Sequence, residues 1–139
     1  MNEPVERAVY MNGEFIPESQ AKVSIYDSAL MFGDMVFEMT RSFNKKQFKL
    51  REHLERLYAS MKYIHLDYPM SIEEMEEAVY KTIEINEPAF QKDDEHRIMI
   101  DVTRGLLGIY EGVNGLRSGP NVIIADFPLK WTVSSMGHL

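Results

Sequence analysis

The clearest helical pattern lies in residues 50–64, where apolar side chains recur at spacings of three and four. Such spacing places side chains along one face of an α-helix. The stripe consists of Leu50, Leu54, Leu57, Met61 and Ile64. His53 falls on this stripe and is expected in the core, whereas Arg56 falls beside it. From spacing alone, Arg56 is a solvated residue that can pair with Glu52 at i,i+4.

A second helix is predicted to begin at Ser71. Ser71 and Glu74 have the spacing of a capping box, in which each side chain bonds the backbone N–H of the other residue. The apolar positions that follow are Ile72, Met75, Val79 and Ile83. Pro88 comes after the last of them, so the helix is expected to end before it.

Strand patterns lie on both sides of the helices. Asn12-Gly13 separates two apolar runs, which is typical of a two-residue hairpin turn because both residues tolerate positive φ. Residues 44–47 are a polar turn, after which a return strand is expected to begin at Phe48. The remaining predicted strands are 35–43, 97–103 and 121–127, and 21–27 is expected to be a short strand or extended segment.

Alternation along 35–43 divides its side chains between the two faces of a sheet. One face carries Met35, Phe37, Met39 and Arg41, and the other carries Val36, Glu38, Thr40 and Ser42. The run 121–127 is apolar almost throughout, so it is expected inside the sheet. With hairpins early and helices grouped, residues 1–139 are predicted to form one α+β domain, a mostly antiparallel sheet with two helices packed on one face.

Composition narrows the class of protein. Twenty-two acidic and fifteen basic residues give a net charge of −7, which argues against nucleic-acid binding. The chain has no cysteine, so disulfides and thiolate metal sites are excluded. No apolar run has the ~20 residues of a membrane span, and the N-terminus has no signal-peptide pattern. A cytoplasmic protein that does not bind membranes is expected.

Several common catalytic motifs are absent from the sequence. The glycine-rich segment 105–119 matches neither phosphate-binding motif of nucleotide folds, and no serine lies in a nucleophile elbow. The histidines lack metal-ligand spacing, so no metal site is predicted. The carboxylates of 73–77 are expected on the solvated face of the second helix.

The order of four segments resembles a known family. They are "NGEFIP", "FGDMVFE", the turn and return to "FKL", and "EHLERL", followed by "VTRG" and "NVIIADFPLKW". Together they resemble the N-terminal small domain of class IV (fold-type IV) pyridoxal-phosphate aminotransferases of the branched-chain type. The resemblance implies an enzyme that transfers an amino group between an amino acid and a 2-oxo acid, with pyridoxal 5′-phosphate as cofactor and a homodimeric assembly.

The resemblance also assigns roles to residues. Arg56 matches the arginine that binds the cofactor's 5′-phosphate, and a guanidinium fork suits a phosphate dianion. Phe37 and Arg41 match substrate-pocket positions of the branched-chain type, whereas Met39 replaces a glycine between them. Arg104, in "VTRG", resembles an arginine of the amine-transaminase and D-amino-acid groups, and a structural and a substrate role are equally open for it.

The chain is about half as long as the family it resembles. The lysine that forms the Schiff base with the cofactor belongs to the family's second domain, and the surroundings of Lys130 in "FPLKW" do not resemble it. No catalytic residue is therefore predicted within 1–139, and this chain alone is expected to be inactive. Two alternatives stay open. One is a D-amino-acid or (R)-amine transaminase, or an aminodeoxychorismate lyase-like enzyme, and the other is a naturally short, non-catalytic binding or dimerisation domain.

Overall fold

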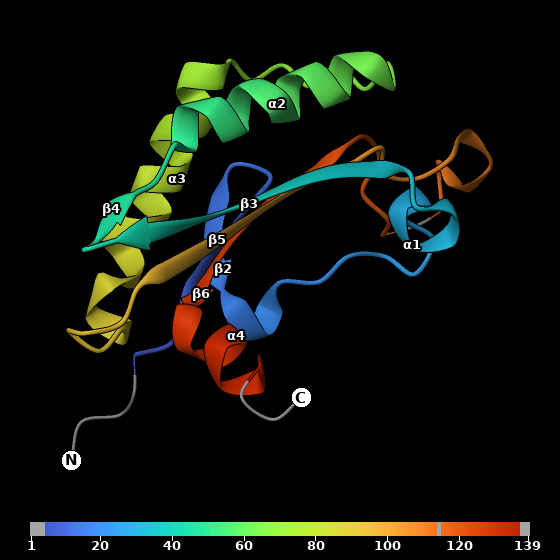
Figure 1. Ribbon diagram of the computed structural model, residues 1–139. Coiled ribbons are helices and arrows are strands. Elements are labelled where there is room, and N and C mark those ends of the chain that lie inside the picture. The colour runs from blue at the N-terminus through green and yellow to red at the C-terminus, as the bar shows by residue number, and fades with distance from the viewer. Residues whose placement is uncertain (1–4, 114, 137–139) are drawn as a thin grey trace.

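The computed structural model describes residues 5–113 and 115–136. Figure 1 shows a sheet with one long helix across the top of the view, a second long helix running down its left side, and shorter helices at the ends of the sheet. In chain order the elements are β1 (Ala8–Met11), β2 (Glu14–Pro17), η1 (Glu18–Gln20), α1 (Ser28–Phe32), β3 (Met35–Phe43), β4 (Lys46–Gln47), α2 (Leu50–Tyr63), α3 (Ile72–Asn86), η2 (Glu87–Ala89), β5 (His96–Thr103), η3 (Gly108–Tyr110), β6 (Asn121–Pro128) and α4 (Leu129–Met136).

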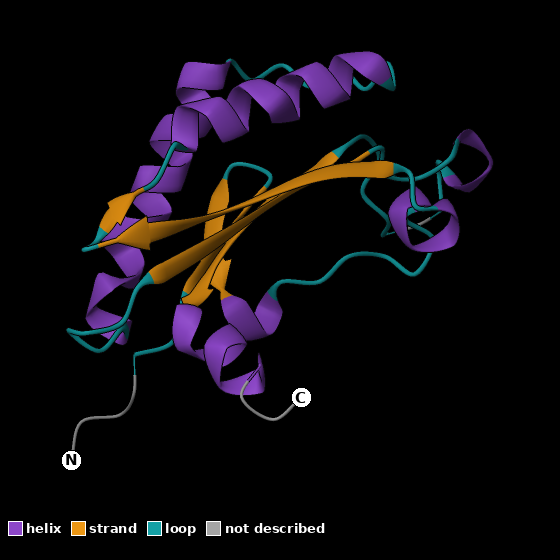
Figure 2. Ribbon diagram, in the orientation of Figure 1, coloured by secondary structure: helices purple, strands orange, loops and turns teal. Residues whose placement is uncertain are grey.

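The six strands form one sheet in the order β2-β1-β6-β5-β3-β4, and every neighbouring pair is antiparallel. The inner position of β6 is the one its apolar sequence predicts. α2 packs on β3, and α3 packs on β1 and β6, so both long helices lie on the same face of the sheet (Figure 2). The predicted α+β fold is confirmed. None of the helices that the structure describes is long and apolar enough to cross a membrane.

The core lies between the two long helices and the sheet. Leu54 and Leu57 of α2 are fully buried, and Ile98, Ile100 and Ile124 of the strands are fully buried opposite them. Burial alternates along β3 as the sequence predicts, with the even-numbered residues toward the helices. All five side chains belong to one buried cluster, and burying a side chain of this size is worth about 1.5–3 kcal/mol, so this cluster contributes strongly to the stability of the fold.

Local signals account for the hairpin and for the start of α3. Asn12 and Gly13 both have positive φ, and Met11 pairs with Glu14 across the turn. At the start of α3, the Glu74 N–H donates to the Ser71 hydroxyl and the Ser71 N–H donates to the Glu74 carboxylate, each at 3.1 Å. The predicted capping box is therefore present in full.

Some predictions about local structure are wrong, and one is narrowed. The segment 21–27, expected to be a short strand or an extended segment, forms no strand, and within it only Asp27 makes an isolated bridge, to Leu106. The return strand after the turn is shorter and earlier than predicted, at Lys46–Gln47, although the Phe48 N–H still donates to the Arg41 carbonyl. Two short helices, α1 and α4, were not predicted at all, because five and eight residues are too few for a periodic pattern.

Gly105 is a position in the long loop where both the backbone conformation and a close contact require a glycine. Its φ is +85°, and a Cβ placed there would lie 2.0 Å from the Gly119 carbonyl oxygen. The two arms of the loop therefore touch at Gly105 and Gly119. This contact holds the ends of β5 and β6 close together beneath the loop.

Candidate functional site

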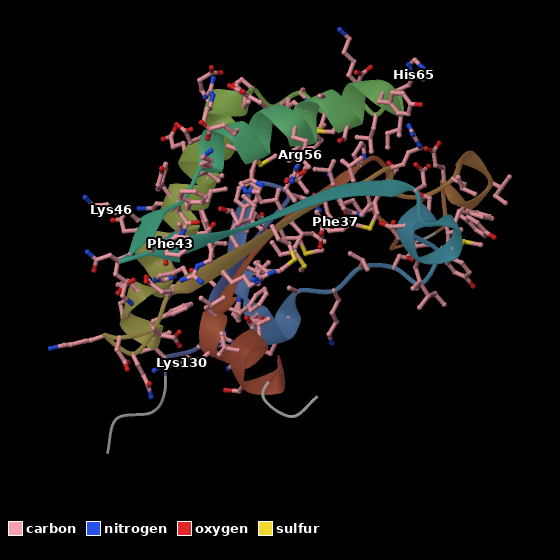
Figure 3. The ribbon with its side chains drawn as sticks, viewed as in Figure 1. Phe37, Phe43, Lys46, Arg56, His65 and Lys130 are labelled. Atoms are coloured by element: carbon pink, nitrogen blue, oxygen red, sulfur yellow. The ribbon has the colours of Figure 1, made fainter. Side chains whose placement is uncertain are left out.

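Arg56 lies on the first half of α2 and forms a two-point ion pair with β3. Its Nε and Nη2 each donate to a different oxygen of the Glu38 carboxylate, at 2.7 Å. His53, one turn earlier, contacts the same carboxylate through Nδ1 at 2.8 Å. The expected pairing with Glu52 is thus wrong, because an inward-facing residue of β3 is closer than the helix's own surface. Figure 3 shows Arg56 between α2 and β3.

The electrostatics of this cluster follow from its unequal burial. The Glu38 side chain is 8% exposed, whereas that of Arg56 is 69% exposed. Hydrogen bonds from Arg56 hold the pKa of Glu38 below its usual value, against burial, which raises it. The carboxylate therefore stays ionised and fixes one edge of the guanidinium. The rest of the Arg56 side chain faces outward.

A hollow of about 200 Å³ adjoins the exposed side of Arg56. It is lined by Lys49, Glu52, His53 and Arg56. Arg56 Nη1 makes no hydrogen bond with the residues that the structure describes. The hollow also lies at the first turn of α2, for which Lys49 is the N-cap, and the N-terminus of a helix attracts anions. Two cations and a helix terminus fit a phosphate group, with Glu52 the one opposing charge.

The other predicted residues of β3 lie on the opposite face of the sheet, called here the outer face. Phe37 is 61% exposed, and Met39 and Arg41 share its face. The Arg41 guanidinium lies 3.8 Å from the centre of the Phe43 ring, and its Nε donates to the Ser42 carbonyl. The structure thus brings Phe37, Met39 and Arg41 to one face, while Arg56 lies across β3 from them.

Arg97 is a candidate that sequence reasoning missed. It pairs directly with Arg41 across β3 and β5, so the two guanidinium groups share the outer face. Like charges placed directly opposite one another destabilise a sheet, and Arg97 Nε is buried without a hydrogen-bond partner. An anion between the two arginines would relieve both costs. The signal was the alternation of 97–103, which becomes informative only once its register with 35–43 is known.

Arg104 is engaged in structural contacts. Its Nε donates to Asp34 at 2.6 Å, and its two terminal nitrogens donate to the carbonyls of Ile64 and His65. The side chain thereby ties the loop after β5 to the end of α2. The substrate role considered for Arg104 stays a prediction.

Arg56 and the outer-face residues lie on opposite faces of β3, at an edge of the sheet where most of β3 has a neighbouring strand on one side only. β3 pairs with β5 along 35–41, but on its other side β4 pairs only with Ser42 and Phe43. Lys130 is remote from this edge in Figure 3 and pairs with Asp93 at 3.0 Å. No group of three or more potential metal ligands occurs within 5–113 and 115–136.

Comparison with known proteins decides the family. The family described as amino-transferase class IV matches residues 35–138. The chain belongs to the class IV aminotransferases. The predicted resemblance is therefore confirmed, and what the chain contains is the N-terminal domain of that family.

The individual relatives fall into two groups. The chain is 44% identical over 78 residues to a Methanocaldococcus jannaschii protein provisionally named a branched-chain-amino-acid aminotransferase, a match to 56% of this chain and 27% of that protein. It is 38% identical over 98 residues to the D-alanine aminotransferase of Staphylococcus aureus, a match to 70% of this chain and 33% of the enzyme. Both branches of the family are thus represented among its relatives.

Solved structures agree with the fold. The branched-chain amino acid aminotransferase of Escherichia coli has a TM-score of 0.73 and 30% sequence identity, covering 91% of this chain and 42% of the enzyme. The branched-chain aminotransferase of Thermoproteus uzoniensis with norvaline has a TM-score of 0.72 and 33% identity, covering 89% and 41%. This chain therefore spans about a third of the curated relatives and two-fifths of the solved structures.

Proposed function

We propose that this chain is the N-terminal domain of a pyridoxal-phosphate-dependent aminotransferase that transfers an amino group between an amino acid and a 2-oxo acid. The observation that carries the proposal is the Arg56 cluster, in which a buried carboxylate holds one edge of an exposed guanidinium at 2.7 Å. Related solved structures contain pyridoxamine 5′-phosphate and a phosphopyridoxyl derivative of glutamate. In the proposal, Arg56 binds the cofactor phosphate.

The cofactor, when bound, supplies an electron sink for the reacting carbon of the substrate. In the proposal, the residues of this chain bind the cofactor and the substrate and orient them. Glu38 and His53 fix Arg56, and the position of Arg56 fixes the phosphate end of the cofactor. On the outer face, the paired guanidinium groups of Arg41 and Arg97 bind a substrate carboxylate, and Phe37 and Met39 form the apolar wall beside it.

We propose that a second domain, outside these 139 residues, supplies the lysine that forms the covalent bond to the cofactor. The support is that the curated relatives and solved structures compared above are about twice as long as this chain. The proposed assembly is a homodimer in the cytoplasm. Its support is the set of exposed apolar side chains near α1, in particular Leu30, Phe32 and Ile109, since patches of this kind commonly mark interfaces.

Branched-chain donors are favoured, and D-amino acids are the second candidate. The relative that is 44% identical and the similar solved structures favour the branched-chain type. The longer alignment, to the D-alanine aminotransferase of Staphylococcus aureus, favours the second candidate. Met39 does not distinguish the two candidates, because its side chain would occupy the same space in the pocket wall beside Arg41 with either kind of substrate.

The deciding experiment begins with the gene downstream of codon 139. If the frame continues, the whole protein is assayed with L-leucine and D-alanine as donors to 2-oxoglutarate, and the 139-residue chain is assayed beside it. We expect turnover with L-leucine by the whole protein and none by the chain alone. Arg97→Gln should raise KM for the 2-oxo acid by about 10- to 100-fold, since hydrogen bonds to charged groups are worth about 1.5–3 kcal/mol.

Each outcome has a defined meaning. Preference for D-alanine would replace the first candidate with the second. A stop codon after Leu139 would leave the non-catalytic binding or dimerisation domain as the remaining interpretation. Turnover by the isolated chain, with a borohydride-reducible cofactor adduct on one lysine, would contradict the assignment of catalysis to a second domain.

A further inference from the structure

A cavity of about 330 Å³ opens on the outer face, away from Arg56. The strands β1, β5 and β6 form its floor, and the segment 18–23 forms a wall. Most of its lining is apolar, namely Val9, Met11, Ala21, Val23, Met99, Ile123 and Ala125. The charged residues that line it are Glu18, Lys22 and Asp101. Its volume is at the small end of the range for small-molecule sites.

Asp101 is the polar group in the floor of this cavity, and it has no partner of opposite charge among the described residues. Its cross-strand neighbours are uncharged, Phe37 on β3 and Ile123 on β6. Glu18 is engaged by Arg7 at 2.6 Å, and Lys22 is exposed and makes no ion pair with Asp101 in the part of the chain that the structure describes. Burial raises the pKa of Asp101 to about 6.

An unpaired carboxylate in an apolar wall is unfavourable for folding, because a desolvated charge costs free energy unless it is compensated. At neutral pH Asp101 is ionised, so a cation would compensate it, and Lys22, which lines the same cavity, makes no ion pair with it among the described residues. A divalent metal would require several oxygen ligands, and Asp101 supplies one carboxylate surrounded by methionine and aliphatic side chains. A cation that carries its own apolar chain matches both the charge and the walls.

We propose that this cavity binds the ammonium group of an aliphatic amine, with the Asp101 carboxylate as its counter-ion. The alkyl chain of the amine lies against Met11, Met99 and Ile123. Asp101 pairs with Phe37 and Met99 pairs with Met39, so this cavity adjoins the proposed carboxylate site on the outer face. The proposal goes beyond the aminotransferase function without depending on it. Its test needs neither cofactor nor turnover.

The test is a titration of the ¹⁵N-labelled 139-residue chain with n-hexylammonium chloride at pH 7.5, followed by amide chemical shifts. We expect saturable shifts at residues 99–101 and 123–125. The uncharged analogue, 1-hexanol, should bind at least about tenfold more weakly than n-hexylammonium, since it cannot form the charge-assisted hydrogen bond with the Asp101 carboxylate. At pH 5, where a group with a pKa of about 6 is mostly protonated, affinity for the amine should fall by about tenfold.

Asp101→Asn is the decisive variant, because it keeps the shape of the side chain and removes its charge. We expect affinity for hexylammonium to fall at least tenfold, while the spectrum shows an unchanged fold. Glu14→Gln, an exposed acidic residue outside this cavity, is the matched control and should leave affinity unchanged. Equal binding by Asp101→Asn, equal binding of 1-hexanol, shifts confined to another surface, or no saturation would each overturn the proposal.

Discussion

On the face of the sheet that the helices cover, buried charges are compensated, whereas on the outer face they are not. His96 is fully buried and lies between Asp126, 2.8 Å from Nδ1, and Glu87, which contacts Nε2. On the outer face, one residue further along β5, Arg97 Nε is buried without a partner, and Asp101 has no ion pair among the described residues. Both faces belong to the same strands.

The difference separates charged side chains that stabilise the fold from charged side chains whose charge another molecule would compensate on binding. On the covered face the buried charged groups are paired within the chain, and Asn86 bonds both the N–H and the carbonyl of Ala8. The exception among polar groups is the Gln47 amide, opposite Ser42, which is buried without a hydrogen-bond partner. Buried charges that remain uncompensated cost stability, so their presence on the outer face is explained if another molecule binds there. The comparison therefore predicts opposite effects of mutation on the two faces.

The largest expected effect is at His96. His96→Leu removes the imidazole and leaves the carboxylates of Asp126 and Glu87 without it, so the free energy of unfolding should fall by about 3–5 kcal/mol. The matched control is Arg97→Leu, which should change the free energy of unfolding by less than about 1 kcal/mol, since no ion pair is lost. Denaturant titrations of the two variants measure this directly. Similar losses for both would remove the contrast between the faces.

A smaller effect is expected from pH. Burial lowers the pKa of His96, but hydrogen bonds to Asp126 and Glu87 outweigh it and raise the pKa above the ordinary value. The charged imidazole therefore stabilises the fold below about pH 6.5, and this stability is lost as pH rises through the folded pKa. Asp101, raised to about 6, favours the folded state when protonated, so stability also falls between about pH 4 and 6.

Asp101→Asn isolates the lower of these two pH ranges. A shift of about two units is worth roughly 3 kcal/mol at full burial, and partial solvent exposure reduces it to about 1–2 kcal/mol. The variant should be more stable than the wild type by that amount at pH 8 and equally stable at pH 4, in thermal melts at both pH values. A variant that is less stable at pH 8 would show that Asp101 is compensated within the chain.

The elements that the sequence predicted well are those whose signal is local. The stripe of 50–64, the capping box at Ser71 and the Asn12-Gly13 turn each depend on residues a few positions apart, and all three are present. The segment 21–27, for which a strand was one of two alternatives, forms none, and its alternating Val23 and Ile25 are exposed rather than half-buried. α1 depends on a cap at Asp27 and a left-handed Gly33, signals that occur without any helical period.

The candidate site was less predictable because it depends on pairs distant in sequence. Arg56 was identified through the family resemblance, but its partner Glu38 lies 18 residues away on a strand. Arg97 and Asp101 became candidates only through the register of β5 with β3 and β6. A strand pattern tells which face a residue takes, and only the register tells which residues share that face.

The measurement that tests the account most directly is dissociation of pyridoxal 5′-phosphate from the whole protein, followed by absorbance for Arg56→Ala and Leu57→Ala, with thermal melts of the cofactor-free forms. Arg56→Ala should weaken cofactor binding by about 10- to 1000-fold and lower stability less than Leu57→Ala, which should lose about 2–5 kcal/mol through a core cavity. Arg56→Lys should fall between wild type and alanine, since it keeps the charge without the fork. If Arg56→Ala retains the cofactor like wild type, or melts like Leu57→Ala, then Arg56 is not the phosphate anchor.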